Sequence, residues 1–299
     1  MIIDRRRCKK ICGYCHEDRG HYICRLSSFI FLFLLLFSFS TLAQAQTYEQ
    51  NVRQIITYLG KDSLQKAEGL IQETLRLDPT RASNTILYQY LGEIYQRQGQ
   101  NEKALDAYNK GIDLSPTTSS LLLSRASLYI QTNNPERALL DYGKVLETEA
   151  DNEEALFFRA YIYAQLRRNK EARADYDRLL ELNPMHEDAR LGLAILNSKD
   201  GRPREAMEQL DALVLLFPFH AKNYLARCGL YEQRKEYEKA MVDVGNAIDL
   251  EPENPECYLT RASLYLAMKK SRLAKQDCQT AIQLGASMEQ VAPLLSQIR

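Results

Sequence analysis

Two cysteines and a histidine near the start of the chain have a spacing that is used in haem chemistry. Cys12, Cys15 and His16 form a Cys-x-x-Cys-His sequence, the pattern in which two thiols attach haem. Three further residues of ligand type lie nearby: Cys8, His21 and Cys24. Their spacing misses the common zinc patterns. They also precede an export segment, residues 26–43, and so would stay away from the compartment where haem is attached. We therefore expect no metal site and no cofactor.

Residues 26–43 form a long uncharged apolar run with the features of an export signal. Seven Lys or Arg residues precede the run, and Ala43-Gln44-Ala45 follows it. A basic stretch, an apolar stretch and small residues at A-x-A are typical of a secretory signal, so we expect a signal peptide over residues 1–45. The remainder would then lie in the periplasm or elsewhere in the cell envelope. The alternative is an uncleaved anchor in the inner membrane, because the run is about long enough to span a bilayer.

Charge and composition exclude several classes of protein. The chain has 299 residues, 39 basic and 39 acidic, and 45% of its residues are apolar, which excludes a disordered chain. Residues 1–45 hold seven basic and three acidic residues, which leaves 32 and 36 and a formal charge of −4 for the rest. Such a chain is not suited to the phosphate backbone, and we expect no nucleic-acid partner.

No catalytic motif follows the export segment. The part of the chain after the export segment has two histidines, His186 and His220. Neither has a Ser, Cys or metal-ligand partner near it in the sequence, and isolated histidines are usually surface residues. The sequence also lacks the nucleophile elbow, the zinc-protease motif, the phosphate loop and the dinucleotide fingerprint. We therefore predict that the protein is not an enzyme.

The elements that would position any binding residues are helices repeated at a fixed period. Pro116, Pro184, Pro218 and Pro252 are separated by 68, 34 and 34 residues. If proline takes unit position 32, six units tile the chain without a gap: 85–118, 119–152, 153–186, 187–220, 221–254 and 255–288. Position 20 is always Ala, position 8 is always small, and positions 4 and 11 are mostly large, which places 4, 8 and 11 on one helical face. A polar turn and a second periodic stretch follow, so each unit is expected to be a helical hairpin.

This unit resembles the tetratricopeptide repeat (TPR). Residues 85–118 meet the family signature almost fully, with Tyr88, Leu91, Gly92, Tyr95, Ala104, Tyr108 and Pro116. The resemblance implies an all-α fold, an α-solenoid in which helix-turn-helix hairpins form a right-handed superhelix. Residues 46–84 are expected to hold a looser first unit and a linker, with Ile55 at the small position, and residues 289–299 a C-terminal capping helix.

An arginine at position 7 and an aspartate at position 23 occur together in four units and are both missing from the other two. Those two have Leu91 with Ala107 and Leu193 with Gln209. The two positions lie about equally far from the turn, so an antiparallel hairpin brings them level. An unpaired guanidinium between the helices would be costly. We therefore expect four structural ion pairs rather than anion receptors: Arg125–Asp141, Arg159–Asp175, Arg227–Asp243 and Arg261–Asp277.

In the resembled family the first helix of each hairpin lines the inside of the superhelix, with positions 5, 9 and 12 opposite the packing face. This stripe is polar in the first full unit and mostly apolar further along. It includes Gly229, Glu232 and Ser263. The candidate peptide-binding groove comprises Gln89, Glu93, Leu123, Ile130, Phe157, Tyr161, Leu191, Ile195, Leu225 and Leu259. We expect an apolar peptide or helix to bind there. The alternative is that these side chains only pack neighbouring repeats.

The expected function is that of a non-enzymatic scaffold of the cell envelope that binds a protein or peptide. The family's clamp for a chain-terminal carboxylate needs Lys at position 5 and Asn at position 9, and no unit here combines them. Two other functions are open. The protein could be a scaffold anchored through residues 26–43 that organises a membrane complex, or an accessory subunit of an exported enzyme or glycan-processing assembly.

Three cysteines follow the export segment. Cys228 and Cys278 occupy core positions 8 and 24, where buried thiols are expected. Cys257, at position 3, lies at about the same height of the last hairpin as Cys278. A disulfide between these two stays open as an alternative, because sequence does not fix the separation of their Cα atoms.

Overall fold

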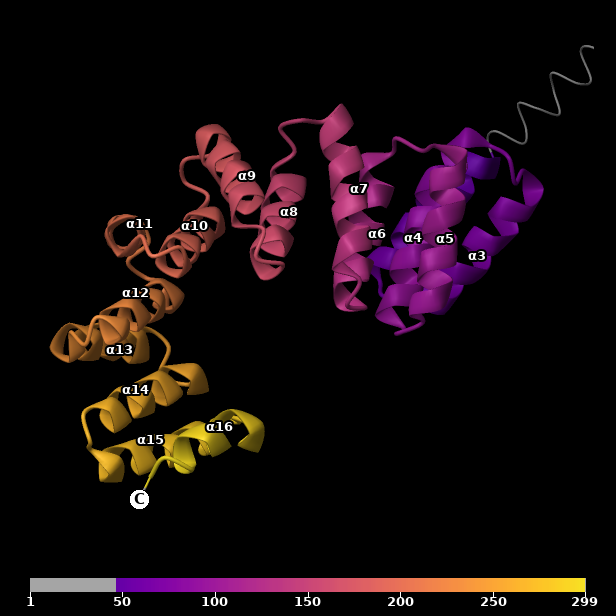
Figure 1. The fold of residues 1–299 in the computed structure, drawn as a ribbon. Coiled ribbons are helices and arrows are strands. Elements are labelled where there is room, and N and C mark those ends of the chain that lie inside the picture. Colours follow the sequence, from indigo (N-terminus) through magenta and orange to yellow (C-terminus); the bar gives the residue numbers. More distant parts are fainter. Residues whose placement is uncertain (1–46, 299) are drawn as a thin grey trace, which may run out of the picture. The chain divides into compact units, whose positions relative to one another are not determined.

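The computed structural model describes residues 47–298, so the export signal, its alternative as an anchor and the Cys-x-x-Cys-His sequence lie outside the described residues. The chain divides into two compact units, the first ending at Pro116 and the second starting at Thr117. Within each unit the described residues are helical and the helices are paired as antiparallel hairpins (Figure 1). This arrangement confirms the predicted all-α solenoid.

The first unit begins with helical residues 47–60 and α3 (Leu64–Leu77). Asn51 Nδ2 donates to Thr74 Oγ1 at 3.0 Å and links these two helices, and Ile55 is fully buried at the position where later units have a small residue. Residues 82–84, which lie between the looser first repeat and the first full one, form the 3₁₀ turn η1 (Ala82–Asn84), in which the buried Asn84 side chain donates to the Asp78 carbonyl at 2.6 Å. The unit ends with α4 (Thr85–Arg97) and α5 (Asn101–Leu114).

The second unit holds five hairpins and a terminal helix. The first helix of each hairpin starts at position 1 of its 34-residue repeat, and the second helix starts at position 17. The hairpins are α6 (Ser119–Gln131) with α7 (Pro135–Thr148), α8 (Glu153–Gln165) with α9 (Asn169–Leu182), α10 (Glu187–Lys199) with α11 (Pro203–Leu216), α12 (Ala221–Gln233) with α13 (Tyr237–Leu250), and α14 (Pro255–Ala267) with α15 (Ser271–Gln283). The terminal helix α16 (Met288–Leu295) packs on the last hairpin and has a capping box from Ser287 and Gln290.

The turn inside each hairpin depends on one residue with a left-handed backbone. Position 15 has positive φ in all six units, at Gly99, Asn133, Arg167, Gly201, Lys235 and Lys269. Only two of these are glycine, the residue that adopts this conformation without a steric penalty. The other four turns therefore hold a side chain in a strained backbone region.

Small residues allow the two helices of a hairpin to approach closely. The residues at positions 8 and 20 are buried in every unit, as in Ala126 with Ala138 and Ala160 with Ala172. The fit is tightest in the first full unit, where a Cβ on Gly92 would overlap the ring of the fully buried Tyr108. Glycine at this position therefore matches the placement of the Tyr108 ring, whereas the next two units combine alanine with a buried tyrosine at the same two positions.

Successive hairpins are joined by a side chain at position 4 that reaches back to the preceding proline. Tyr224 Oη donates to the Pro218 carbonyl at 3.1 Å, and Tyr258 Oη donates to the Pro252 carbonyl at 3.0 Å. In the unit before these two, Arg190 takes this role, with Nη2 donating to the Pro184 carbonyl at 2.6 Å. These bonds satisfy carbonyls that follow the end of a helix.

Candidate functional site

The four arginine–aspartate pairs connect the two helices of one hairpin. In each pair Arg Nε and Nη2 donate to the two carboxylate oxygens at 2.7–2.9 Å, for Arg125–Asp141, Arg159–Asp175, Arg227–Asp243 and Arg261–Asp277. The aspartates are buried, and the hydrogen bond to Asp175 raises the pKa of Arg159. Such two-pronged bonds use the charge of the guanidinium within the hairpin, which argues against a role in anion binding.

The two units without this pair differ from each other. Leu91 and Ala107 are both buried, and they form part of the lining of a cavity of about 320 Å³ between α3, α4 and α5. In the unit 187–220 the amide oxygen Oε1 of Gln209 instead accepts a bond from Arg190 Nη1 at 2.9 Å. In this unit the guanidinium that contacts position 23 therefore comes from position 4, whereas in the four units with an ion pair it comes from position 7.

His220 is exposed, as expected for a surface histidine, and His186 is half-buried, and both contact neighbouring side chains. His186 caps α10, because its Nδ1 accepts a hydrogen bond from the Ala189 amide at 3.2 Å, and its ring stacks on Phe157 with centroids 5.4 Å apart. His220 Nδ1 lies 2.7 Å from Glu187 Oε2, and its ring stacks on Phe217. The sequence could not show this pairing, because Glu187 is 33 residues away and belongs to the preceding unit.

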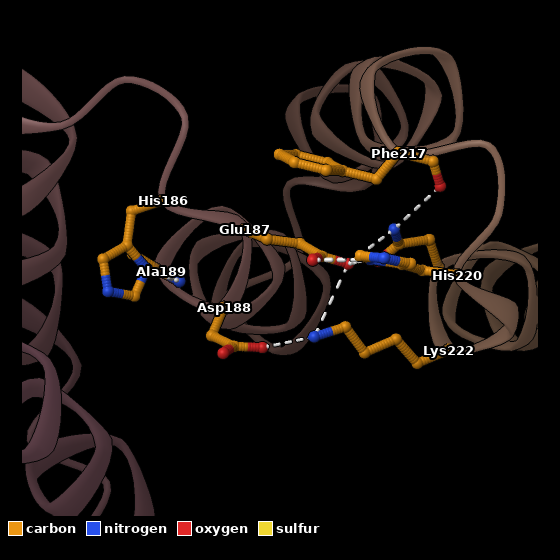
Figure 2. A network of polar contacts seen from close by, with 8 residues as sticks. His186, Glu187, Asp188, Ala189, Phe217, His220 and Lys222 are labelled. Atoms are coloured by element: carbon orange, nitrogen blue, oxygen red, sulfur yellow. Dashed lines mark hydrogen bonds and ion pairs between the residues drawn. The ribbon is translucent and has the colours of Figure 1, made fainter.

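Glu187 is the centre of a polar network between α10 and α12 (Figure 2). Its side chain is only 13% exposed, and its oxygens contact His220 and accept a bond from Asn223 Nδ2 at 2.9 Å. Lys222 Nζ lies 3.5 Å from Glu187 Oε1 and donates to Asp188 Oδ1 at 2.6 Å. The network fixes the N-terminal ends of two first helices relative to each other, and it neutralises Lys222.

Beside this network the first helices α10, α12 and α14 form a groove of about 570 Å³. Its apolar lining comprises Leu191, Ile195, Leu225, Ala226, Gly229 and Leu259. Its polar lining comprises Lys222, Glu232, Glu256, Thr260 and Ser263. We call this site the α10/α12/α14 groove. Water-accessible aliphatic surface with a few polar groups is the usual composition of a site that binds a ligand or a peptide.

The groove residues expected from the sequence fall into several environments. Leu191, Ile195, Leu225 and Leu259 line the α10/α12/α14 groove together. Phe157 instead packs between hairpins, in edge contact with Phe158 as well as against His186, so the packing role expected as the alternative applies to it. The remaining ones, Leu123, Ile130, Tyr161, Gln89 and Glu93, lie on α6, α8 and α4.

Exposure also separates these residues. Ile195 is 45% exposed and Tyr161 is 44% exposed, whereas Leu123 and Ile130 are half-buried. Gln89 and Glu93 belong to the first unit, where the Gln89 amide donates to Glu93 at 3.1 Å. Sequence reasoning missed Lys222 and Glu256 in the groove. Both occupy position 2, which shares a helical face with positions 5 and 9, so the 3.6-residue period could have found them.

The three cysteines that follow the export segment are free and buried. Cys257 packs against Ala221 and Ala247 of the preceding hairpin, whereas Cys278 packs inside the last hairpin. The alternative of a Cys257–Cys278 disulfide is therefore wrong, because position 3 faces the previous unit rather than its own second helix. Burial raises the pKa of Cys257 to about 11 and that of Cys228 to about 12.

Residues 47–298 contain no cluster of metal-ligating side chains. In that range no three His, Cys, Asp or Glu side chains are grouped so that they could hold a metal ion. Nor does any helix in this part of the chain have the length and apolar character needed to cross a membrane.

Comparisons with known proteins show that the repeated unit is similar to the tetratricopeptide repeat. Three family models, each described as a tetratricopeptide repeat, match residues 86–118, 123–187 and 165–228. The crystal structure of a tetratricopeptide repeat protein from Parabacteroides merdae is 29% identical, with a TM-score of 0.72, and the match covers 85% of this chain and 99% of that one. No curated protein matches the chain.

Two more distant structures share the fold. YrrB, described as a TPR protein with an unusual peptide-binding site, is 22% identical with a TM-score of 0.52, and the match covers 67% of this chain and 97% of that one. The pilF protein of Pseudomonas aeruginosa is 17% identical with a TM-score of 0.57, and the match covers 71% of this chain and 97% of that one.

Proposed function

We propose that this chain, which matches tetratricopeptide repeat models over much of its length, is a protein-binding scaffold whose α10/α12/α14 groove holds a segment of a partner protein. Proteins built from this repeat generally bind proteins or peptides and are typically not enzymes. Rigid helices that present a continuous surface suit this role, because little conformational entropy is lost when a partner binds.

The observation that carries this proposal is the exposed aliphatic surface of the groove. Ile195 is 45% exposed although it is a large apolar residue on a first helix, and three half-buried leucines lie beside it in the groove: Leu191, Leu225 and Leu259. Exposed apolar surface that is contiguous and bordered by polar groups is typical of an interaction site. A partner segment that covers these side chains would remove them from water at a gain of roughly 25 cal/mol per Å².

Gly229 provides a test that leaves the fold intact. A Cβ at this position would meet nothing within 4 Å, and the residue lines the groove. The Cβ of Gly229→Leu would therefore meet no neighbour, the rest of the side chain would occupy the groove, and the propensity of α12 would improve by up to about 1 kcal/mol. Gly245→Leu is a matched control, because Gly245 is also inside a helix, α13, with open space at its Cβ, and it does not line the groove.

The experiment is a crosslinked purification of the full chain from its native cells, with wild type, Gly229→Leu and Gly245→Leu compared by quantitative mass spectrometry. We expect one or more partners to fall about tenfold or more with Gly229→Leu and to stay with Gly245→Leu. A partner set that is identical in all three would show that binding, if it occurs, uses another surface. Circular dichroism of both variants checks that the helices are retained.

We also propose that the scaffold works outside the cytoplasm. The support is the sequence of residues 1–45, with its basic stretch, apolar run and A-x-A end. Mass spectrometry of the native N-terminus distinguishes the two forms of this proposal. A chain that starts at Gln46 would be a released protein of the periplasm or envelope, and a chain that retains residues 26–43 would be an anchored scaffold.

A further inference from the structure

The polar lining of the α10/α12/α14 groove has an excess of negative charge. Glu232 and Glu256 both line it, and neither forms an ion pair with any Lys or Arg among residues 47–298. Glu232 accepts a hydrogen bond from Ser263 Oγ at 2.8 Å, which holds its carboxylate between α12 and α14. The carboxylates therefore present uncompensated charge to a ligand.

Among the described residues that line the groove, Lys222 is the single cation, and it is already neutralised. Lys222 Nζ donates to Asp188 Oδ1 at 2.6 Å and lies 3.5 Å from Glu187 Oε1 (Figure 2). An acidic ligand would have to compete with two carboxylates for this ammonium group, and it would also approach Glu232 and Glu256. Charge at the groove thus disfavours an acidic segment and favours a basic one.

Gly229 leaves a gap in the row of side chains along the groove. At the same unit position the adjacent first helices carry Ile195 and Ser263, whereas α12 has only hydrogen, and a Cβ added there would meet nothing within 4 Å. Leu225 and Leu259 line the same space. The gap is thus suited to one aliphatic side chain of a ligand, in a groove that is lined by Leu225 and Leu259 and by the carboxylates of Glu232 and Glu256.

We infer that the α10/α12/α14 groove recognises a protein segment in which an aliphatic side chain lies close to a lysine or arginine. This inference rests on the proposed function and specifies the chemistry of the partner. The aliphatic side chain fills the gap at Gly229, and the cationic group pairs with Glu232 or Glu256. Both interactions are made in a partly enclosed site, where charge-assisted hydrogen bonds are stronger than at an open surface.

The probe is a library of random peptides, each about a dozen residues long, displayed on phage and selected on the full chain. We expect enriched peptides to combine Leu, Ile, Val or Met with a Lys or Arg within a few residues. One enriched peptide is then synthesised in two forms, with its basic residue or with norleucine in that place, and binding to each is measured by fluorescence anisotropy.

Variants of the two carboxylates identify the charge contact. The double variant Glu232→Gln and Glu256→Gln keeps the shape of both side chains, and the amide oxygen at position 232 would still accept the Ser263 bond. We expect this variant to bind the basic peptide about tenfold more weakly and the norleucine peptide unchanged, and the difference between the peptides should shrink at high salt. Gly229→Leu should abolish binding of both peptides, and Gly245→Leu should leave both unchanged.

The outcomes separate this inference from the proposed function. If Gly229→Leu removes binding of the selected peptides but they show no basic preference and no response to the Glu→Gln changes, the inference is wrong and the groove is still a binding site. If no selected peptide depends on Gly229, both the inference and the use of this groove are wrong. Enrichment of acidic peptides at the groove would also overturn the inference.

Discussion

Arg159 and Asp175 form a two-pronged ion pair between α8 and α9, with Nε and Nη2 each 2.7–2.8 Å from a carboxylate oxygen. The Asp175 side chain is 9% exposed and that of Arg159 is 24% exposed. Arg159→Ala would leave a nearly buried carboxylate without its partner, so we expect a loss of about 3 kcal/mol in the free energy of unfolding. Chemical denaturation followed by circular dichroism measures it.

The double variant of this pair tests whether the two residues act together. If they do, Arg159→Ala with Asp175→Ala should cost less than the sum of the single changes, with a coupling of about 0.5 to 3 kcal/mol. Strictly additive losses would contradict a structural ion pair. Arg178, which is on the surface and bonded to Asp151 and Glu181, provides a control with a small expected effect.

Lys235→Gly should stabilise the protein. Lys235 has φ of 58° in the turn between α12 and α13, whereas the equivalent turn between α10 and α11 has Gly201 at 71°. Glycine relieves the strain of a left-handed backbone, although it also raises the entropy of the unfolded chain, and the net gain is expected to be up to about 1 kcal/mol. Thermal and urea unfolding measure the change.

The reverse substitution is the control for that turn. Gly201→Ala introduces a Cβ into the same conformation and should destabilise by a similar amount, although nothing lies within 4 Å of the new atom. A loss of stability in Lys235→Gly, or no loss in Gly201→Ala, would show that backbone strain at position 15 is not significant.

Gly92→Ala should destabilise the first full repeat, although four other units have alanine at this position. The new Cβ would overlap the ring of the fully buried Tyr108, which would have to move, toward the placement that Tyr142 has beside Ala126 and Tyr176 has beside Ala160. We expect a loss of about 1 to 3 kcal/mol in the free energy of unfolding, as for an overpacked core. Urea unfolding measures this loss.

A second substitution tests whether the ring is the cause. Tyr108→Leu in the Gly92→Ala background should restore part of the stability, because it removes the ring that the new methyl group overlaps, and the unit 187–220 already has Ala194 with Leu210 at these two positions. If the Gly92→Ala protein were as stable as wild type, the seam between α4 and α5 would be loose enough to accept a methyl group.

Cys228 should make the stability depend on alkaline pH. Burial, followed by the nearby charges of Glu232 and Asp243, raises the pKa of its thiol from 9.0 to about 12. In the unfolded chain the thiol ionises near its ordinary pKa. The contribution of the buried neutral thiol to the free energy of unfolding is therefore fully present below about pH 9 and is lost as pH rises toward 12. Between these values the unfolding free energy should fall with pH more steeply in wild type than in Cys228→Ala.

Alanine is the appropriate replacement because four other units have it at position 8. The difference in unfolding free energy between wild type and Cys228→Ala should be constant below about pH 9 and should change above it. Parallel curves up to about pH 12 would mean that the thiol ionises without unfolding, and thus that it is less isolated from water than its burial indicates.

The sequence predicted most reliably those features that lie inside one repeat. The hairpins, the small residues at positions 8 and 20 and the pairing of positions 7 and 23 follow from helical geometry and from comparison among the six units. Features between repeats were predicted less well, because they depend on how one hairpin packs on the next. This explains why Glu187 was not connected with His220, why a Cys257–Cys278 disulfide stayed open and why Lys222 and Glu256 were missed in the groove.

Each arginine–aspartate bond is closed within a single 34-residue unit, and this has a consequence for how such a chain can grow or shrink. Copying or deleting a whole unit carries both charges together, so neither is left unpaired in the new protein. A cut through the turn of a hairpin would separate Arg159 from Asp175 and leave each in an apolar seam. A copy that begins in a turn keeps the ion pair only where both of the units that it joins carry it, whereas a copy of a whole unit always does.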